Sequence, residues 1–464
     1  MLRKASVFAV SLYLIVASIY SQASPADNLA QAIRFKTVSE QDRSKIDYSQ
    51  FDQFHQFLQE TYPLVFSQLS VERINGYSLL IQWPGSNPTK QAILFASHMD
   101  VVPVEPGTEA DWEYPAFDGV VADEKIYGRG TLDNKQGVIG WLEAAEQLLA
   151  EGFQPQRKLV FAFGHDEEIS GYNGAAFIAK RMQDLGLHFE WMVDEGGLIV
   201  SNYPLVKDRP VAIINVGEKR YFTITLIATG EGGHSSSPPK TSTIGRLSAA
   251  LAKIEQTPFP TRIEGPVAAM LEGIAPYADQ PMKAAFNNLW LTGGLVGYQM
   301  SKDRNTVGFV RTTTALTMIN AGVKENVIPQ RAEAKINFRI LPGDTPQTVV
   351  KAIRKLIDDE NIEIRSEKSL PAAPVADYVG GGFKVMSSAT KMVYPNAVVV
   401  PSLLFAATDS RHYIDLVDNI YRYYGVIMEP SQTKSIHGTN EFVSVDSFDK
   451  SIEIAKEIIR RGSE

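Results

Sequence analysis

The sequence predicts an α/β fold in which a mixed sheet is flanked by helices and carries an inserted α+β lid domain. Short apolar runs at 92–96, 158–163 and 191–193 suit strands that are covered on both faces. An amphipathic helix is expected between the first two runs, over 136–151. At 221–227 bulky and hydroxyl residues alternate, which is typical of an antiparallel sheet with one wet face. A second domain therefore begins near this strand.

The same periodicities predict the remaining elements. The helix over 136–151 has four apolar residues on one face and ends at Gly152, where a left-handed backbone is easiest for glycine. Aromatic and leucine residues at helical spacing predict an earlier helix over 50–66. The other expected elements are a strand at 78–83, helices at 244–254 and 348–358, a strand at 332–340 and a C-terminal helix at 445–461.

These elements suggest a domain organisation with an interrupted catalytic domain. The expected segments are a signal peptide (1–23), the first part of the catalytic domain (24–216), the lid domain (217–366) and the second part of the catalytic domain (367–464). The lid contains extra helical and loop material at 266–311.

Composition narrows the classes of partner and metal site. The net charge of the 464 residues is -8, so no positive field gathers phosphates and nucleic acid is an unexpected partner. Cysteine is absent, which excludes thiol nucleophiles, disulfides and cysteine-ligated zinc. Any metal must be held by His, Asp and Glu.

The N-terminal segment has the pattern of a targeting sequence. Arg3 and Lys4 precede an apolar stretch at 5–20, and small residues at 21–23 suit cleavage. We therefore expect a secreted or periplasmic protein with no stable membrane span after cleavage. An uncleaved membrane anchor is the alternative, but the stretch is shorter than the roughly 20 residues of a spanning helix.

Acidic and histidine residues follow the predicted strands. His98 and Asp100 follow the first apolar run, Glu167-Glu168 the second and Asp194-Glu195 the third. Because open sheets gather their sites at the carboxyl ends of strands, these side chains are expected to converge. Taken singly, each has an ordinary alternative, such as a solvated surface pair of glutamates.

Three positions carry a more specific expectation. His98 and Asp100 are two residues apart and so point the same way along a strand, which lets Asp100 orient the imidazole while the other ring nitrogen binds a metal. Asp133 lies in a glycine-bounded turn before a helix, where an isolated Asp would ordinarily cap the helix N-terminus.

Three motifs together resemble the co-catalytic zinc peptidases. They are Ser-His-Met-Asp-Val-Val-Pro at 97–103, Tyr-Gly-Arg-Gly-Thr-Leu-Asp-Asn-Lys at 127–135 and Gly-His-Asp-Glu-Glu at 164–168. That family includes carboxypeptidase S, carboxypeptidase G, the aminoacylases and the N-acyl-amino-acid synthase/hydrolases. The likeness is strongest to the carboxypeptidase S branch, and it implies a zinc-peptidase-like fold.

The resemblance implies a role for each motif residue. It assigns two zinc ions to five ligands: His98 and Asp194 on one ion, Glu168 and His437 on the other, and Asp133 bridging both. Glu167 would be the general base, since a carboxylate that is not a ligand must take the proton of the attacking water. Such His, Asp and Glu sites also accept cobalt or manganese.

Further positions match the family's substrate-contacting residues. His234, within 232–236, would stabilise the oxyanion from the lid, although a flexible polar loop would suit the same glycines and serines. Asn326, Arg339 and Arg411 would bind substrate, and an arginine fork suits a free α-carboxylate. Alternatively, the arginines pair with acids such as Asp344 or Asp409.

We therefore predict zinc-dependent hydrolysis of the amide next to a free C-terminal amino acid, in short peptides or N-acyl amino acids. The rival functions are a deacylase or aminopeptidase with the same metals, and a metal-free binding module on this fold. A homodimer through the lid is compatible with the sequence. Whether His234 acts in its own chain or in a partner stays open.

Overall fold

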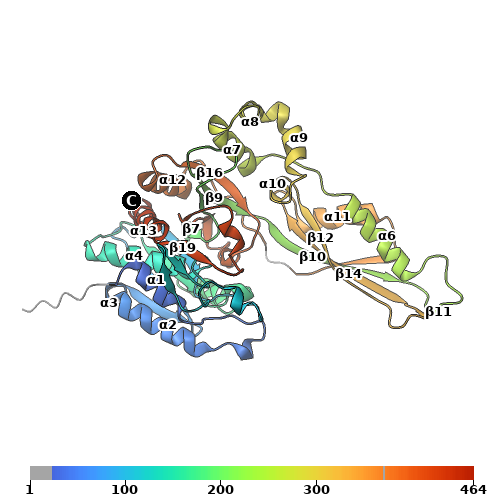
Figure 1. Ribbon diagram of the computed structural model, residues 1–464, viewed down its shortest axis with the longest axis horizontal. Helices are drawn as coiled ribbons and strands as arrows, with labels where there is room; N and C mark the ends of the chain where they lie inside the picture. The colour runs from blue at the N-terminus through green and yellow to red at the C-terminus, as the bar shows by residue number, and fades with distance from the viewer. Residues whose placement is uncertain (1–22, 369–370) are drawn as a thin grey trace, which may run out of the picture.

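The computed structural model describes residues 23–368 and 371–464 and has two parts, a catalytic domain and a lid that projects from it (Figure 1). All but one residue of the predicted signal segment therefore lies outside the described residues. Within the described ranges, no helix is both long and apolar enough to cross a membrane.

The catalytic domain is built on a mixed sheet, as predicted. In spatial order its strands are β1 (Ser70–Ile74), β2 (Ser78–Trp83), β6 (Leu159–Gly164), β3 (Ala92–His98), β7 (Phe189–Asp194), β17 (Val417–Arg422), β9 (Val211–Glu218), β8 (Ile199–Val200) and β18 (Ile427–Met428), with β16 (Val398–Leu404) also paired to β9. Strands β6, β3, β7 and β17 are parallel neighbours, whereas β2 joins β6 in the antiparallel sense. The carboxyl ends of β6, β3 and β7 therefore meet at one edge.

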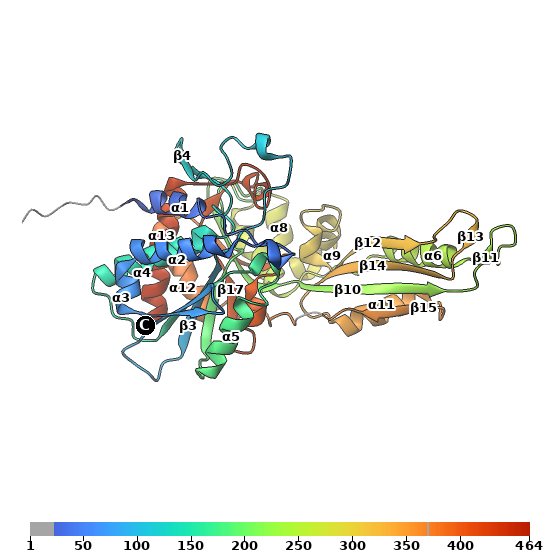
Figure 2. The ribbon, with the colours of Figure 1, turned by 90° about the horizontal axis from the view of Figure 1, so that it is seen from below.

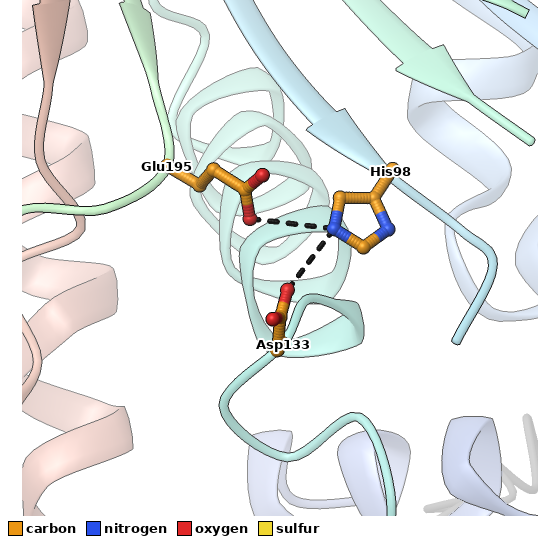
Figure 3. Close-up of side chains that lie close together, drawn as sticks. All are labelled: His98, Asp133 and Glu195. Atoms are coloured by element: carbon orange, nitrogen blue, oxygen red, sulfur yellow. Dashed lines mark hydrogen bonds and ion pairs between the residues drawn. The ribbon is translucent and has the colours of Figure 1, made fainter. Parts of the chain in front are cut away.

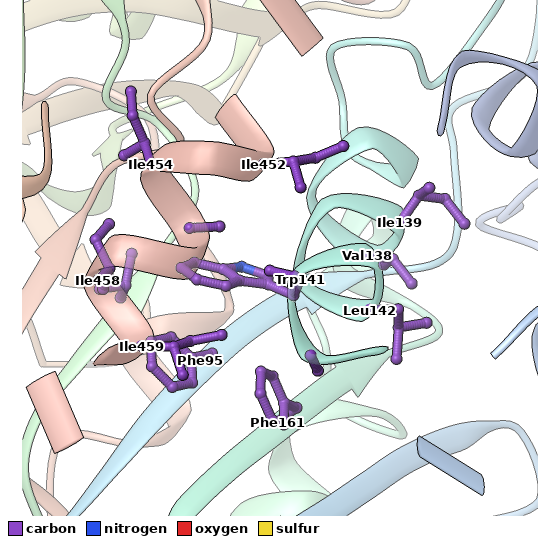
Figure 4. Packing of buried hydrophobic residues seen from close by; sticks show 14 of the residues in the cluster. Phe95, Val138, Ile139, Trp141, Leu142, Phe161, Ile452, Ile454, Ile458 and Ile459 are labelled. Atoms are coloured by element: carbon purple, nitrogen blue, oxygen red, sulfur yellow. The ribbon is translucent and has the colours of Figure 1, made fainter. Parts of the chain in front are cut away.

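Helices cover both faces of this sheet, which explains the continuous apolar runs. Along β3, Ile93 and Phe95 belong to the core on one face, whereas Leu94 and Ala96 belong to the core on the other. Trp141 packs on Phe95 on the first face (Figure 4). The first face is covered by α1 (Pro25–Ile33), α4 (Lys135–Ala150), α12 (Gly381–Val393) and α13 (Val445–Ser463), and the second by α5 (Ala175–Asp184).

The predicted helix over 50–66 is two helices, α2 (Tyr48–Thr61) and α3 (Pro63–Gln68). Pro63 has no amide hydrogen to continue α2, but it suits the first position of a new helix. A small sheet of β4 (Val120–Ala122), β5 (Lys125–Tyr127) and β19 (Phe442–Ser444) lies beside the catalytic domain.

The lid is an antiparallel sheet with helices on one face (Figure 2). Alternate residues of its strand β14 are buried, the pattern of a sheet with one wet face. Its strands in order are β12 (Thr313–Ala321), β14 (Arg331–Ile340), β10 (Arg220–Thr229) and β15 (Ile362–Ser366), and its helices are α6 (Thr243–Gln256) and α11 (Pro346–Ile357).

The extra material of the lid segment packs on the catalytic sheet rather than on the lid sheet. Met270 and Ile274 of α7 (Gly265–Ile274) share a core with Val398 and Val400 of β16. The remaining helices of this insert are α8 (Met282–Phe286), α9 (Leu289–Met300) and α10 (Val307–Val310). The insert therefore links the lid segment to the edge of the catalytic domain (Figure 1).

Candidate metal centre and its flanking cavity

His98 is the last residue of β3, and its imidazole is buried between three carboxylates. Its Nδ1 lies 3.0 Å from the carbonyl oxygen of Asp100 and 3.3 Å from Oδ1 of the same residue. Its Nε2 faces Asp133 Oδ1 at 3.1 Å and Glu195 Oε2 at 3.3 Å (Figure 3). The ring is thus held through one nitrogen and presents the other to two carboxylates.

Asp133 belongs to a second group on its other side. Its Oδ2 lies 3.0 Å from His437 Nε2, which in turn lies 3.3 Å from Glu168 Oε2. Within each group, His98–Asp133–Glu195 and Asp133–Glu168–His437, the ligand atoms lie within 4.8 Å of one another. One carboxylate is therefore shared by two sets of nitrogen and oxygen donors.

The donor atoms of these groups fit a pair of divalent cations. Neutral imidazole and carboxylate are the ligands that zinc, cobalt and manganese accept in proteins without cysteine. Glu168 Oε1 is buried and has no hydrogen-bond partner, so the site contains an acceptor that the protein itself does not satisfy.

The protonation equilibria also indicate that compensating positive charge is needed. Burial raises the pKa of Glu195 to about 8, and hydrogen bonds to Asp133 and Glu168 raise the pKa of His437 to about 10. Burial opposes the charge of Asp133, but hydrogen bonds from His437 and His98 hold the pKa of Asp133 far below its ordinary value. Without a metal, bound protons offset the negative charge of these clustered carboxylates, and bound cations would offset the same charge.

The structure brings Glu195, rather than the adjacent Asp194 that the resemblance implied, to face His98 and Asp133. The Asp194 carboxylate instead accepts the Ser410 N–H at 2.9 Å, and its carbonyl accepts the Tyr423 N–H at 2.8 Å. Strand β7 ends at Asp194 and the chain turns at Gly196, whose φ is +109°. The sequence alone could not separate two adjacent carboxylates, because the turn decides which of them points inward.

Asp100 connects the histidine to the glutamate pair that follows β6. Its Oδ1 accepts the Glu167 N–H and its Oδ2 the Glu168 N–H, both at 3.1 Å. The Ser39 hydroxyl also donates to Oδ2, at 2.6 Å. One buried carboxylate therefore fixes the positions of His98, Glu167 and Glu168 together.

Glu167 lies beside both groups but belongs to neither. Burial, and then the charge of Glu195, raise the pKa of Glu167 well above its ordinary value. Its Oε1 lies 4.0 Å from Arg411 Nη2. This carboxylate is therefore placed to accept a proton next to the metal groups without being used as a ligand.

Glu441 is a buried residue of this region that the sequence did not reveal. Its Oε1 accepts the backbone N–H groups of Gly130, Leu132 and Asp133 at 3.1, 2.7 and 3.1 Å. Its Oε2 accepts from Arg129 Nη1 at 2.6 Å. The only signal in the sequence is that Glu441 lies four residues after His437. The segment that supplies His437 therefore also supplies the carboxylate that fixes the turn of Asp133.

Arg339 and Arg411 line one cavity of about 510 Å³ that also contains Glu167 and Glu168. Arg339 stacks over Tyr221 at 4.9 Å and donates to the Phe405 carbonyl at 3.3 Å. We call it the basic cavity, because Lys219, Arg220 and Lys368 also line it. Arg339 is not the partner of Asp344, which pairs with Arg262 at 2.9 Å.

His234 and Asn326 lie together, but away from the other predicted site residues. His234 is on β11 (Gly233–His234), which pairs with β13 (Val327–Ile328), and the Asn326 carbonyl accepts the Ser235 N–H at 3.1 Å. This hairpin is at the end of the lid farthest from the catalytic domain (Figures 1 and 2). Neither residue lines the basic cavity of its own chain.

Comparison with known proteins relates the chain to one family of peptidases. The family model for peptidase family M20/M25/M40 matches residues 94–461. The N-fatty-acyl-amino acid synthase/hydrolase PM20D1 of Bos taurus is 37% identical, over 94% of this chain and 87% of the bovine protein. Carboxypeptidase S of Saccharomyces cerevisiae is 31% identical, over 91% of this chain and 81% of the yeast protein.

Solved structures share the fold. The M20 family metallo-carboxypeptidase Sso-CP2 of Sulfolobus solfataricus superposes with a TM-score of 0.64 at 19% identity, over 94% of this chain and 98% of that one. The YXEP protein of Bacillus subtilis, described as a dinuclear metal binding peptidase, has a TM-score of 0.60 at 13% identity, over 94% and 98%.

Proposed function

Because the chain belongs to peptidase family M20/M25/M40, we propose that it hydrolyses the amide bond next to a free C-terminal amino acid, in short peptides or N-acyl amino acids. One observation carries the proposal. Asp133 is shared by two groups of metal-ligating side chains, and the unliganded carboxylate of Glu167 lies next to them in a cavity that also contains Arg339 and Arg411.

We assign two divalent cations to the groups that share Asp133. His98 and Glu195 would complete one site, and Glu168 and His437 the other. We propose zinc as the metal, since the donor set suits it, and cobalt or manganese as substitutes in vitro. Bound there, the ions supply Lewis acidity toward the scissile carbonyl and lower the pKa of a water molecule.

The side chains of the protein supply the proton transfer. Glu167 accepts a proton from the attacking water and delivers it to the nitrogen of the departing amino acid, so it ends the cycle in its starting state. Asp100 holds the Glu167 backbone and the His98 ring in fixed relation, at 3.1 Å and 3.0 Å through its carboxylate and carbonyl oxygens. The general base is therefore positioned by the residue that also orients a ligand.

Arg339 and Arg411 are proposed to bind the free carboxylate of the substrate. A guanidinium fork matches a carboxylate in geometry and charge. Arg411 lies 4.0 Å from Glu167, so a carboxylate held by Arg411 would place the neighbouring amide close to the general base. An amine-first aminopeptidase has no comparable use for two arginines at this position.

His234 and Asn326 are proposed to act from a second copy of the chain. Their hairpin is remote from the metal groups of its own chain, which favours contribution across a lid-mediated homodimer (Figure 2). Mixing Glu167→Gln and His234→Ala subunits tests this. Random pairing should restore about a quarter of the wild-type activity if the histidine acts in trans. No restoration would contradict it.

Export from the cytoplasm is proposed from the basic and apolar segments that begin the chain. N-terminal sequencing of the protein from its native source should find a start near residue 24, whereas a start at Met1 would contradict cleavage.

The proposed activity is tested by metal content and by one substitution. Purified protein should contain two equivalents of metal and cleave members of a panel of N-acyl amino acids and dipeptides. The Glu167→Gln variant should retain the metal and lose roughly 100- to 10,000-fold in kcat. Full activity of that variant would refute the assigned base.

A further inference from the structure

Lys219 lies at the junction between the catalytic sheet and the lid sheet. It is the single residue between β9, which ends at Glu218, and β10, which begins at Arg220. Lys219 lines the basic cavity, yet only 1% of its surface is exposed. A lysine in a cavity proposed to hold a carboxylate can bind that carboxylate directly or can support other residues. The partners of its ammonium group decide between these roles.

The ammonium group of Lys219 is occupied by the end of the insert. Its Nζ donates to the carbonyl oxygen of Gly308 at 3.0 Å and to that of Arg311 at 2.8 Å. The Thr313 hydroxyl oxygen lies 3.5 Å from the same Nζ. An ammonium group has three donor hydrogens, and the two short bonds go to backbone carbonyls. Lys219 therefore holds the segment around α10 rather than presenting its donors to the cavity.

The segment that Lys219 holds packs on Phe405. The rings of Phe309 and Phe405 lie 4.4 Å apart between centroids, at an interplanar angle of 60°. A Cβ on Gly308 would lie 3.0 Å from Phe405 Cζ, so the backbone of α10 comes close to the same ring. Lys219 Nζ lies 5.8 Å from the centroid of that ring, within the range of a cation–π contact. Phe405 is therefore packed against both Lys219 and α10.

Phe405 in turn contacts a proposed substrate-binding arginine. Its carbonyl oxygen accepts a hydrogen bond from Arg339 Nη1 at 3.3 Å, while the Arg339 guanidinium stacks over Tyr221 at 4.9 Å. Phe405 is followed by Ala406 and Ala407, which line the basic cavity. A displacement of Phe405 would therefore move both the guanidinium and the adjoining wall.

The bonds from Lys219 matter because they satisfy carbonyl groups inside the protein. The bond to the Gly308 carbonyl is buried, so removal of the ammonium group would leave that oxygen without this donor. An unsatisfied buried carbonyl is costly, and α10 should shift to relieve it. Because Phe405 packs on α10, the shift would reach Arg339. Binding groups that are misplaced by even a fraction of their contact distance lose much of their effect.

We propose that Lys219 is a positioning residue for Arg339, and that the insert thereby helps to set the affinity for the carboxylate of the substrate. The proposal rests on the proposed function, since it takes Arg339 to bind that carboxylate. It gives the insert at 266–311 a role in substrate recognition, although the insert supplies none of the described lining residues of the basic cavity.

The test compares KM for N-acetylphenylalanine, which has a free carboxylate, with KM for N-acetylphenylalanine amide, which does not. Lys219→Met removes the donors, and Phe309→Ala removes the packing on Phe405. Each variant should raise KM for the free acid by roughly 3- to 30-fold, change kcat less, and leave KM for the amide unchanged. Lys302→Met, at an exposed lysine of the same insert, should match the wild type on both substrates.

A double-mutant cycle separates positioning from direct binding. If Lys219 acts through Arg339, Lys219→Met should raise KM for the free acid in the wild type and add little in an Arg339→Ala background. An equal rise in both backgrounds would show that Lys219 binds the carboxylate itself and would overturn the proposal. Circular dichroism and thermal melting identify the folded variants. If Lys219→Met does not fold, the same cycle is run with Phe309→Ala, and an unchanged KM in that variant would overturn the proposal.

Hydrogen exchange separates this inference from the proposed function, because it needs no turnover. In Lys219→Met the backbone amides of 403–408 should exchange faster than in the wild type, since Phe405 loses its support, whereas Lys302→Met should leave them unchanged. If the wild type cleaves no substrate, the proposed function fails. Faster exchange at 403–408 would then still support the path from Lys219 to Arg339, and unchanged exchange would overturn it.

Discussion

The loops at the carboxyl edge of the catalytic sheet and the tip of the lid differ in how their functional side chains are held. At the sheet edge, Asp100 and Glu441 are fully buried and fix their neighbours through backbone hydrogen bonds. At the lid tip, His234 is exposed and its ring nitrogen Nδ1 lies 2.8 Å from the hydroxyl oxygen of nearby Ser236. The proposed metal half of the site is preformed within one chain, whereas the proposed lid half lies apart from it in that chain.

The strongest test of the preformed half is removal of the shared ligand. Asp133→Ala takes a donor from both groups, so kcat/KM should fall by more than the roughly 100- to 10,000-fold that loss of a general base produces. Steady-state kinetics on an N-acyl amino acid measure this. Asp123→Ala, at an exposed turn, is the control, and a variant of Asp133 with near wild-type rates would remove the metal assignment.

The next largest effect should distinguish the two adjacent carboxylates after β7. Glu195→Ala should lower kcat by at least the roughly 10- to 100-fold seen when residues one step outside a metal site are changed. Asp194→Asn can still accept the Ser410 N–H through its amide oxygen, so it should lose less. Kinetic comparison of the two variants decides between them, and the reverse order would favour Asp194 as ligand.

Glu441 provides a test of how strongly the sheet-edge loops depend on their buried supports. Glu441→Gln removes the charge that faces Arg129 and the turn of Asp133, so metal affinity should fall roughly 10- to 100-fold. Loss of metal to a chelator, followed over time, measures this. Glu429→Gln, on the exposed surface, should behave like the wild type. Equal metal loss in both variants would show that Glu441 has no positioning role.

Arg411→Ala tests the role of the basic cavity in binding the substrate carboxylate. Loss of a charge-assisted hydrogen bond should raise KM by roughly 10- to 100-fold for substrates with a free carboxylate. A substrate with a C-terminal amide lacks that charge, so wild type and variant should treat it alike. An unchanged KM on the free acid would remove the assignment.

The smallest effect concerns the stability of the metal-free protein. The pKa of His437 is raised from 6.5 to about 10, so the stability that its charge contributes is complete below pH 6.5 and is lost as the pH rises through about 10. The pKa of Glu195 is raised from 4.5 to about 8, so the stability that its neutral form contributes is complete below pH 4.5 and is lost as the pH rises through about 8. Chelated protein should therefore melt at lower temperature at pH 9 than at pH 6, and a flat profile would contradict these shifts.

The sequence predicted the catalytic sheet well because its signals are local. The apolar runs of β3 and β6 face helices on both sides, and α4 ends before Gly152 as its periodicity indicates. The insert at 266–311 was not placed, because its docking on β16 depends on Val398 and Val400, which are distant in the sequence.

Strand geometry predicted the convergence of the residues after β3 and β6, whereas Asp133 and His437 lie in turns and were assigned only through the family resemblance. His98 ends β3 and Glu168 lies four residues beyond the end of the neighbouring β6, so the sheet brings them together. Glu195 was missed because its inward direction follows from the turn at Gly196. Glu441 was missed because its backbone partners at 130–133 are about 310 residues away along the chain, at 311 to Gly130 and 308 to Asp133.

The most direct test of two ions sharing one carboxylate is a calorimetric titration of chelated protein with zinc. The wild type should bind two equivalents, and Glu195→Ala should bind one, held by Asp133, Glu168 and His437. One equivalent in the wild type, or two in Glu195→Ala, would contradict the account.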